Sequence, residues 1–196
     1  MAAPSLRPYI TREEYERLED GAESKSEWFD GEIVAMPGAS LPHETINRNL
    51  SRAATFQLEG TRCDQLDKDV RVKARLATTY PDLTIVGGDP AFDEKSRMAT
   101  LLNPIALFEI VSPSSRIVDY ERKWEAYQEI ASLRDYVIVL QDRMRVEHYR
   151  REAGGLWLYQ SLNVEHDRLQ LAGTPFAISL AEIYRGVAFS DRRLPQ

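Results

Sequence analysis

The spacing of apolar and polar residues at the start of the chain predicts a short helix followed by a hairpin. Thr11 and Glu14 form a capping box for a helix that ends near residue 20. Residues 26–36 indicate a β-hairpin that turns at Asp30-Gly31. Both elements precede the longer periodic segments of the chain.

A longer helix is predicted to begin near Pro42, because proline suits a first helical position, and to end at Gly60. One face of this helix is apolar at helical spacing, with Ile46, Leu50, Ala53, Ala54 and Leu58. His43 lies one turn before Ile46, so its side chain is expected to point toward the buried side.

Three strands are expected next, at about 68–76, 80–86 and 105–111. A second helix is predicted over about 119–131, where Tyr120, Trp124, Tyr127 and Ala131 form an apolar stripe. The continuous apolar run at 136–140 indicates a strand that is covered on both faces.

The remaining residues predict an antiparallel strand pair and a closing helix. The strands are expected near 144–150 and 156–162, around a turn at Gly154-Gly155, and the helix at 178–185. The order of all these elements predicts an α/β fold with a mixed sheet and helices on its faces. We expect a single domain, residues 1–196.

The composition, with 43% hydrophobic and 29% charged residues, is typical of a soluble globular protein. The first ten residues lack the apolar run of a signal peptide, and no stretch approaches the roughly 18 apolar residues of a membrane span. A cytoplasmic protein is therefore expected. The single cysteine, Cys63, excludes an internal disulfide and a cysteine-based zinc site.

The net charge of −6 weighs against a simple nucleic-acid binder, because surfaces that bind phosphates are usually basic. Metal binding by some acidic residues would reduce this objection. So would a local basic patch formed by two arginine-rich segments, 71–75 and 143–145. Each segment is equally compatible with the solvated face of a strand.

Glu109 is a carboxylate inside a strand that is apolar on both faces. Ile105, Leu107 and Val111 share its face, and the residues between them are also apolar. Burying an ionised carboxylate there costs several kcal/mol unless a partner compensates the charge. Taken alone, a glutamate in a strand more often pairs with an arginine or lies at a sheet edge.

Asp82 repeats the pattern in the stretch 80–86, where it shares a face with Tyr80, Thr84 and Val86. If the two strands are neighbours, Asp82 and Glu109 converge, and converging anions require a proton or a cation between them. A hard divalent ion with oxygen ligands, Mg²⁺ or Mn²⁺, is the simplest cation of this kind. Taken alone, an aspartate after a proline is more often a turn residue.

Lys123 places a cation near this pair. It lies four residues before Tyr127, so its stem runs beside the apolar stripe of a helix that begins just beyond the Glu109 strand. The alternative is an i,i+4 ion pair with Asp119 on a solvated surface, worth about a few tenths of a kcal/mol. Spacing alone leaves both interpretations open.

Several short motifs follow one another in a specific order: residues 26–34, His43, Tyr80-Pro-Asp82, residues 108–115, Asp119, Lys123 and Tyr127. In order and spacing they resemble the Uma2 family, which is placed in the PD-(D/E)XK nuclease superfamily. The resemblance runs from about Tyr15 to Leu140 and is weaker beyond. No single motif decides it, because each one is short.

The resemblance implies a restriction-endonuclease-like αβββαβ core with a mixed sheet, extended by an N-terminal helix and hairpin and a C-terminal β-hairpin. Asp82 matches the PD aspartate, and Glu109 matches the acidic residue of the (D/E)XK element. The lysine position of that element is Val111 in this chain. The resemblance implies that Lys123 supplies the lysine from the following helix.

The activity implied by the resemblance is metal-dependent hydrolysis of DNA. Asp82 and Glu109 would hold Mg²⁺ or Mn²⁺, which polarises the phosphate and lowers the pKa of a bound water. Lys123 would orient that water or stabilise the developing charge. His43 or Glu27, which match a histidine and an acidic position of the family, would complete the metal shell or assist proton transfer. Alternatively, His43 is a partly buried structural histidine and Glu27 forms a cross-strand pair.

Two other functions stay open at this point. One is a non-catalytic module that binds nucleic acid or protein and keeps the nuclease fold. The other is a hydrolase of another class that uses Asp82 and Glu109 as an acid/base pair. The serines at 112, 114 and 115 do not indicate a nucleophile, since they follow the strand in a turn without a Gly-x-Ser-x-Gly elbow.

A homodimer is a modest expectation, because one compact domain carries one site and cleavage of both DNA strands together requires two. The C-terminal hairpin, with Tyr149, Leu156, Trp157 and Tyr159, is a candidate interface. The same residues are also compatible with ordinary core packing.

Overall fold

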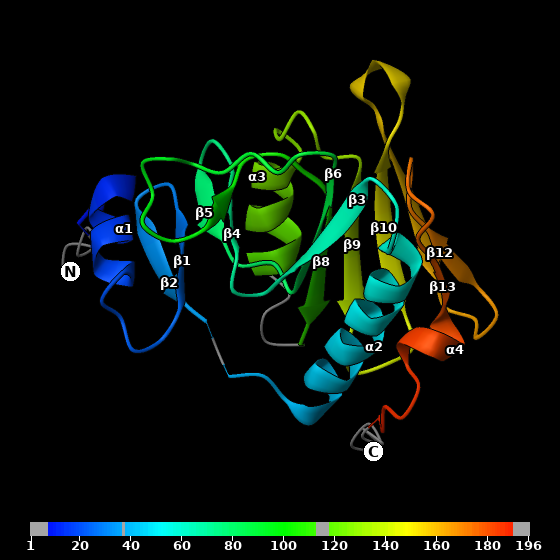
Figure 1. The fold of residues 1–196 in the computed structure, drawn as a ribbon. Coiled ribbons are helices and arrows are strands. Elements are labelled where there is room, and N and C mark those ends of the chain that lie inside the picture. Colours follow the sequence, from blue (N-terminus) through cyan, green and yellow to red (C-terminus); the bar gives the residue numbers. More distant parts are fainter. Residues whose placement is uncertain (1–7, 37, 113–117, 190–196) are drawn as a thin grey trace.

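The computed structural model describes residues 8–36, 38–112 and 118–189, with the backbone alone for 118–120. A six-stranded sheet in the order β11-β10-β9-β8-β6-β3 carries the core (Figure 1). Its strands are β3 (Cys63–Asp67), β6 (Leu83–Gly87), β8 (Pro104–Val111), β9 (Asp135–Leu140), β10 (Val146–Arg151) and β11 (Trp157–Leu162). Strands β8 and β9 run parallel and the other neighbours are antiparallel, which confirms a mixed sheet.

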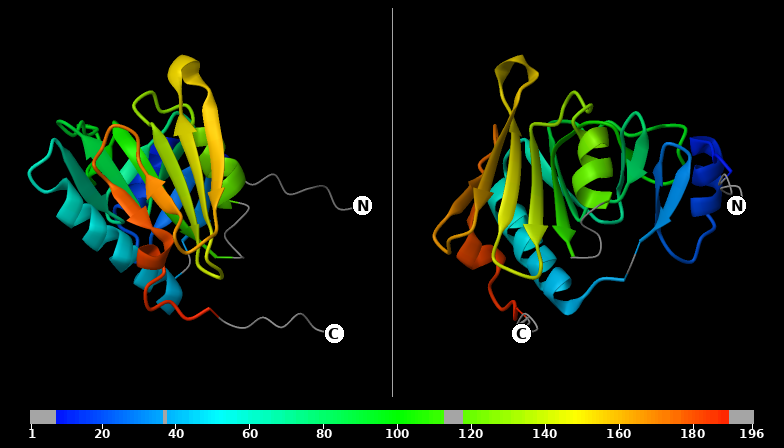
Figure 2. Two further views of the ribbon diagram at one scale, coloured as in Figure 1. Left: turned by 90° about the vertical axis from the view of Figure 1, so that its right-hand side faces the viewer. Right: turned by 180° about the vertical axis from the view of Figure 1, so that it is seen from behind.

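Helices cover both faces of this sheet (Figure 2). Helix α2 (Leu41–Leu58) packs its apolar side on one face, and Ser40 caps it by accepting a hydrogen bond from the amide of His43. Helix α3 (Trp124–Tyr127) covers the other face and continues from a π-helix, Val118–Lys123. The order α2, β3, β6, β8, α3, β9 is the expected αβββαβ core.

A second sheet, in the order β2-β1-β5-β4-β7, packs on the α3 side. Its strands are β1 (Ser26–Phe29), β2 (Glu32–Ala35), β4 (Arg71–Lys73), β5 (Ala77–Thr79) and β7 (Thr100–Leu101), and helix α1 (Arg12–Glu19) precedes β1. The expected capping box of α1 is present. Asp30 and Gly31 both have positive φ at the β1–β2 turn, as a two-residue hairpin of this type requires.

The C-terminal part adds a short hairpin, β12 (Arg168–Gln170) and β13 (Ala177–Ser179), and helix α4 (Leu180–Ile183). These elements enlarge the α2 side of the core. The expected β10–β11 hairpin and the closing helix are confirmed. No helix in the described ranges has the length and apolar character needed to span a bilayer.

Three predicted boundaries are wrong. The core strand expected at 68–76 is Cys63–Asp67, and a turn separates it from the three-residue β4. The strand expected at 80–86 begins only at Leu83, because Pro81 has no amide hydrogen for a sheet ladder. The helix expected over 119–131 ends at Tyr127, and the side chain of Tyr120 lies outside the described residues.

Candidate active site

Asp82 lies just before β6, against the strand that carries Glu109. The antiparallel ladder of β6 and β8 ends with Leu83 opposite Phe108. The Asp82 amide donates to the Phe108 carbonyl at 3.0 Å, and the Ile110 amide donates to Asp82 Oδ2 at 2.7 Å. Asp82 is therefore hydrogen-bonded to the residues on both sides of Glu109, so the expected neighbourhood of the two strands is confirmed.

Glu109 is buried on the α3 side of the sheet, with 3% of its surface exposed. Its Oε2 accepts a hydrogen bond from Lys123 Nζ at 2.8 Å, and its Oε1 accepts one from the Tyr127 hydroxyl at 2.9 Å. Both oxygens thus have partners, which compensates the cost of burying the charge.

Lys123 joins two carboxylates that come from different sheets. Its Nζ lies 2.8 Å from Glu109 Oε2 on β8 and 2.9 Å from Glu27 Oε1 on β1. Lys123 and Glu27 are both buried, and the Tyr80 amide also donates to Glu27 Oε1 at 3.0 Å. The solvated-surface interpretation of Lys123 is wrong. Glu27 pairs with the lysine of the site, so it is not a simple cross-strand partner within the hairpin.

Tyr127 is a further member of the site, to which the sequence assigned no chemical role. It was expected in the apolar stripe of the second helix, but its hydroxyl contacts Glu109 and lies 2.7 Å from Thr79 Oγ1. Burial, and after it the charge of Glu109, raises the pKa of Tyr127 well above its ordinary value of 10.0. The phenol therefore stays protonated and holds the orientation of Glu109.

His43 reaches Asp82 from the first turn of α2. Its Nε2 lies 3.0 Å from Asp82 Oδ1, and both side chains are largely buried. The His43 Nδ1 atom is buried without a hydrogen-bond partner among the described residues, and Glu44 Oε1 lies 3.9 Å away. The expected inward direction of His43 is confirmed, and it contacts a site residue.

The His43–Asp82 contact predicts a pH-dependent contribution to stability. Burial disfavours the charged imidazole, but the hydrogen bond and charge of Asp82, with Glu44, outweigh it, so the pKa of His43 is raised above its ordinary 6.5. A group with a raised folded-state pKa stabilises the fold fully below its unfolded pKa, and this contribution is lost as the pH rises through the folded pKa.

We therefore expect His43→Gln to lower the melting temperature most below pH 6.5 and progressively less above it. Thermal unfolding over a pH series measures this difference. His166→Gln is a matched control, because His166 is exposed between β11 and β12. A difference between wild type and His43→Gln that does not change with pH would contradict the expectation.

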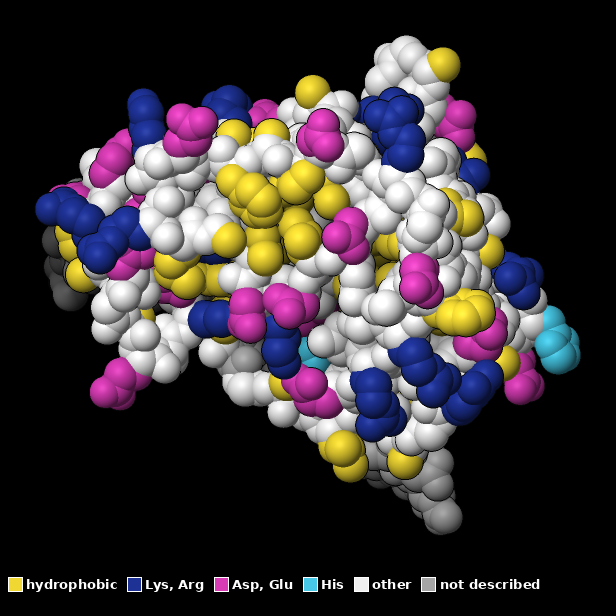
Figure 3. Space-filling view, in the orientation of Figure 1, with side chains coloured by type: hydrophobic (Ala, Val, Ile, Leu, Met, Phe, Trp, Pro, Cys, Tyr) yellow, Lys and Arg dark blue, Asp and Glu magenta, His cyan; other side chains and the backbone are white. Residues whose placement is uncertain are grey.

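The first arginine-rich segment, 71–75, does not form a local basic patch. Arg71 is fully buried and donates to Thr100 and Ser96, while Lys73 pairs with Asp93 at 2.5 Å and Arg75 with Glu129 at 2.8 Å. On the face drawn in Figure 3, hydrophobic side chains gather at the centre, and acidic and basic side chains are mixed around them.

Two ion pairs between segments far apart in the sequence lie on the exposed side of the site. Lys68 Nζ lies 2.9 Å from Glu44 Oε1, and Lys25 pairs with Asp69. The Lys25 ammonium also lies 4.8 Å from the centre of the Tyr80 ring, next to Pro81 and Asp82. These partners come from segments far apart in the sequence, so no local pattern indicated them.

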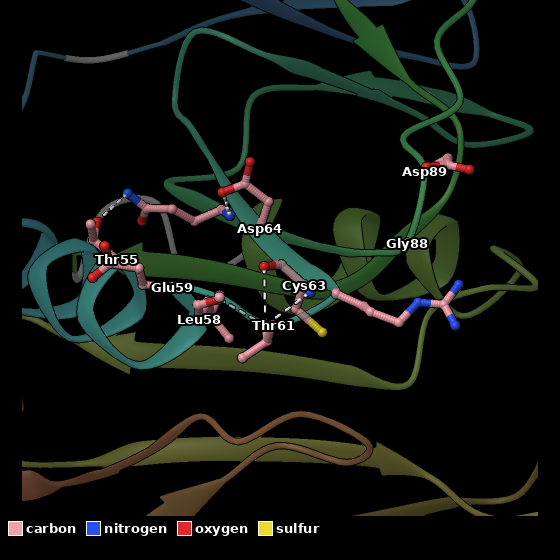
Figure 4. Close-up of a pocket in the computed structure, with 11 residues that line it drawn as sticks. Thr55, Leu58, Glu59, Thr61, Cys63, Asp64, Gly88 and Asp89 are labelled. Carbon is pink, nitrogen blue, oxygen red and sulfur yellow. Dashed lines mark hydrogen bonds between the residues drawn. The ribbon is translucent and has the colours of Figure 1, made fainter.

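An open hollow of about 670 Å³ lies away from this cluster (Figure 4). Thr55, Glu59, Thr61 and Cys63 line it from the end of α2 and the start of β3, and Gly88 lines it from beyond β6. Asp82 precedes β6 and Gly88 follows it, which separates them by about 20 Å along an extended strand. The hollow is therefore not part of the Asp82 site.

Comparison of the sequence with known protein families identifies the family of the chain. Residues 12–182 match the Uma2 family, which is described as "Putative restriction endonuclease". The chain belongs to the Uma2 family. The matched range includes the five site residues expected from the sequence, Glu27, His43, Asp82, Glu109 and Lys123, and also Tyr127.

Two uncharacterized Synechocystis proteins are similar to this Uma2 chain. Protein sll1609 is 30% identical over 165 residues, which are 83% of this chain and 93% of the relative. Protein slr1290 is 30% identical over 184 residues, which are 93% of this chain and 95% of the relative.

The fold also matches a solved structure, a "putative nuclease belonging to DUF820" from Anabaena variabilis. The TM-score is 0.74 with 17% identity, over 89% of this chain and 97% of that chain. At this identity the likeness establishes the fold alone. It confirms a nuclease-like architecture for the Uma2 chain.

Proposed function

We propose that this Uma2 protein is a metal-dependent endonuclease that hydrolyses DNA phosphodiester bonds at Asp82, Glu109 and Lys123. One observation carries the proposal: Asp82 is hydrogen-bonded to both neighbours of Glu109, while Lys123 Nζ lies 2.8 Å from Glu109 itself. Two carboxylates can hold a divalent ion and a lysine can stabilise charge on a phosphate, and both roles serve phosphodiester hydrolysis.

The donor atoms fit a small divalent ion. Mg²⁺ is usually bound by one or two carboxylates and keeps several waters, so it does not need a cage of protein ligands. Among the described residues no group of three or more acidic, histidine or cysteine side chains is placed to hold a metal, so the proposed site uses two carboxylates and leaves the other positions of the ion to water. Asp82 Oδ1 accepts a hydrogen bond from His43 Nε2 at 3.0 Å, so His43 orients the carboxylate that would hold the ion.

In the proposed site Asp82 and Glu109 would hold Mg²⁺ or Mn²⁺, and His43, which is hydrogen-bonded to Asp82, would assist proton transfer. The bound ion supplies charge stabilisation at the phosphate and a water of lowered pKa. Lys123 Nζ lies between Glu109 and Glu27, where it would orient the attacking water or oppose the charge that develops on phosphate. Tyr127 fixes Glu109 through the second carboxylate oxygen.

A non-catalytic module that retains the nuclease fold is the second candidate. The observation in its favour is that both oxygens of Glu109 already have hydrogen-bond donors and that only 3% of the residue is exposed. An ion that binds Glu109 must compete with Lys123 or Tyr127. A hydrolase that uses Asp82 and Glu109 as an acid/base pair without metal is the third interpretation. Its activity would survive removal of metal by a chelator, whereas that of the proposed endonuclease would not.

The test is the cleavage of supercoiled plasmid by the purified full chain with Mg²⁺ or Mn²⁺. We expect nicked and linear products with metal and none after addition of EDTA. Cleavage that persists in EDTA would support the acid/base hydrolase. If a well-folded protein leaves plasmid, branched DNA, single-stranded DNA and RNA intact with both metals, the proposal is overturned in favour of the non-catalytic module.

A further inference from the structure

A row of aromatic side chains crosses three neighbouring strands on the α3 side of the sheet. Tyr136 of β9, Tyr149 of β10 and Tyr159 of β11 are directly opposite one another in the strand register. The Tyr136 and Tyr149 rings are 6.0 Å apart and nearly parallel, and those of Tyr149 and Tyr159 are 5.1 Å apart. We refer to these three residues, with Trp124 and Trp157, as the aromatic platform.

The two tryptophans extend the platform toward the active site and toward the hairpin tip. The Trp124 ring lies 4.3 Å from Tyr149 and 5.0 Å from Trp157. Trp124 directly follows Lys123, and at the buried end Tyr136 lies 5.2 Å from Tyr127, which holds Glu109. The rings of the platform therefore pack directly against residues that neighbour or hold the proposed catalytic residues.

The outer end of the platform is open to solvent. Tyr136 is fully buried, Trp124, Tyr149 and Trp157 are half-buried, and Tyr159 is 47% exposed. Strand β11 forms the edge of the sheet, and the β10–β11 hairpin projects beyond the rest of the molecule (Figure 2). Rings that served core packing alone would be covered, whereas these become more exposed from β9 to β11.

A positive charge lies on this surface, in a protein whose net charge is −6. The Arg151 guanidinium lies 4.6 Å above the Trp157 ring, and it forms no ion pair with a carboxylate in the described part of the chain. Arg145 Nη2 lies 3.5 Å from the Tyr159 hydroxyl. Arg145 is paired with the buried Glu147 at 2.9 Å, so its charge is matched. Arg151 donates hydrogen bonds to the carbonyls of Gln128 and Ala131, which leave its positive charge uncompensated by a carboxylate among the described residues.

We propose that the aromatic platform binds unpaired bases of a nucleic-acid strand and leads that strand to the Lys123 end of the active site. Aromatic faces beside an arginine are the chemistry that binds single strands, because every base can stack and the cation attracts the phosphates. This inference rests on the proposed function in taking nucleic acid as the substrate. It adds that single-stranded segments are the preferred form.

The test measures binding and not cleavage. Fluorescence anisotropy of a labelled oligo(dT) in EDTA reports the affinity of wild type, Tyr159→Ala and Leu158→Ala. Leu158 is the matched control, because it is 53% exposed on the same strand but points to the opposite face. We expect Tyr159→Ala to raise the Kd about five- to tenfold, and Leu158→Ala and Tyr159→Phe to leave it within about twofold.

Three outcomes would overturn the inference. They are an absence of oligo(dT) binding by wild type, an equal loss of affinity in Tyr159→Ala and Leu158→Ala, and a wild-type dimer that Tyr159→Ala converts to monomer. The last outcome would make the platform an interface between two copies of the chain. Plasmid cleavage by the same preparations separates the two proposals. Cleavage without ring-dependent binding removes the platform alone, and ring-dependent binding without cleavage removes the nuclease alone.

Discussion

Replacing Lys123 by alanine is expected to destabilise the fold by about 3–5 kcal/mol, because it leaves two carboxylates buried without their cation. Lys123 is 3% exposed, and its ammonium contacts Glu27 and Glu109 at 2.9 and 2.8 Å. Glu27 and Glu109 are 4% and 3% exposed, so water cannot replace the lost charge. Urea unfolding followed by tryptophan fluorescence measures the change.

Lys73→Ala is the matched control for this prediction. Lys73 is likewise ion-paired, with Asp93, but its side chain is 28% exposed. We therefore expect Lys73→Ala to lower the free energy of unfolding by at most about 1 kcal/mol. If Lys123→Ala does not fold, a triple variant carries the test: Lys123→Met with Glu27→Gln and Glu109→Gln removes all three charges and should restore folding. Equal costs for Lys123→Ala and Lys73→Ala would contradict the assigned role.

Asp82→Asn is expected to lower DNA cleavage by at least about 10²- to 10³-fold, since a lost metal ligand removes several kcal/mol of transition-state stabilisation. The fold should tolerate the change. The asparagine carbonyl still accepts the hydrogen bond of the Ile110 amide, so we expect a loss of about 1 kcal/mol in unfolding free energy. Cleavage rates with saturating Mg²⁺ or Mn²⁺, together with urea unfolding, measure both effects.

Asp64→Asn makes the same chemical change at an exposed aspartate of β3, the strand next to β6. It should retain full activity, which separates loss of a ligand from loss of one negative charge near the sheet. Wild-type cleavage by Asp82→Asn would place the metal elsewhere. Equal losses in both aspartate variants would assign the effect to overall charge.

The buried carboxylates were the part of the site that sequence could predict. A charge in a doubly apolar strand is costly, so the pattern of residues around Glu109 was enough to require a partner for it. Tyr127 could not be recognised in this way, because its helical spacing is the same whether the ring fills the core or its hydroxyl binds Glu109. Lys123 and Glu27 meet only because β1 lies against the end of the π-helix that leads into α3, and no spacing of residues records that contact.

The elements of the fold were predicted wherever apolar periodicity was strong, as in α2, β8 and β9. Strand β3 was missed because Cys63–Asp67 is mostly polar and lies at the sheet edge, where one side of the strand needs no apolar cover. The basic segment at 71–75 was misjudged for a similar reason. Arg71 is buried and donates hydrogen bonds to the hydroxyls of Ser96 and Thr100. Arg75 is paired with Glu129, which lies 54 residues away in the sequence.

The position of Glu27 limits how this protein can be shortened or recombined. The β1–β2 hairpin lies outside the αβββαβ core, and an engineer seeking a minimal catalytic unit would remove it first. Its Glu27 nevertheless provides one of the two carboxylates that bind Lys123. The shortened unit would therefore keep every core strand but lose an ion-pair partner of the site lysine. Chimeras between Uma2 relatives should therefore inherit β1 and α3 from the same parent.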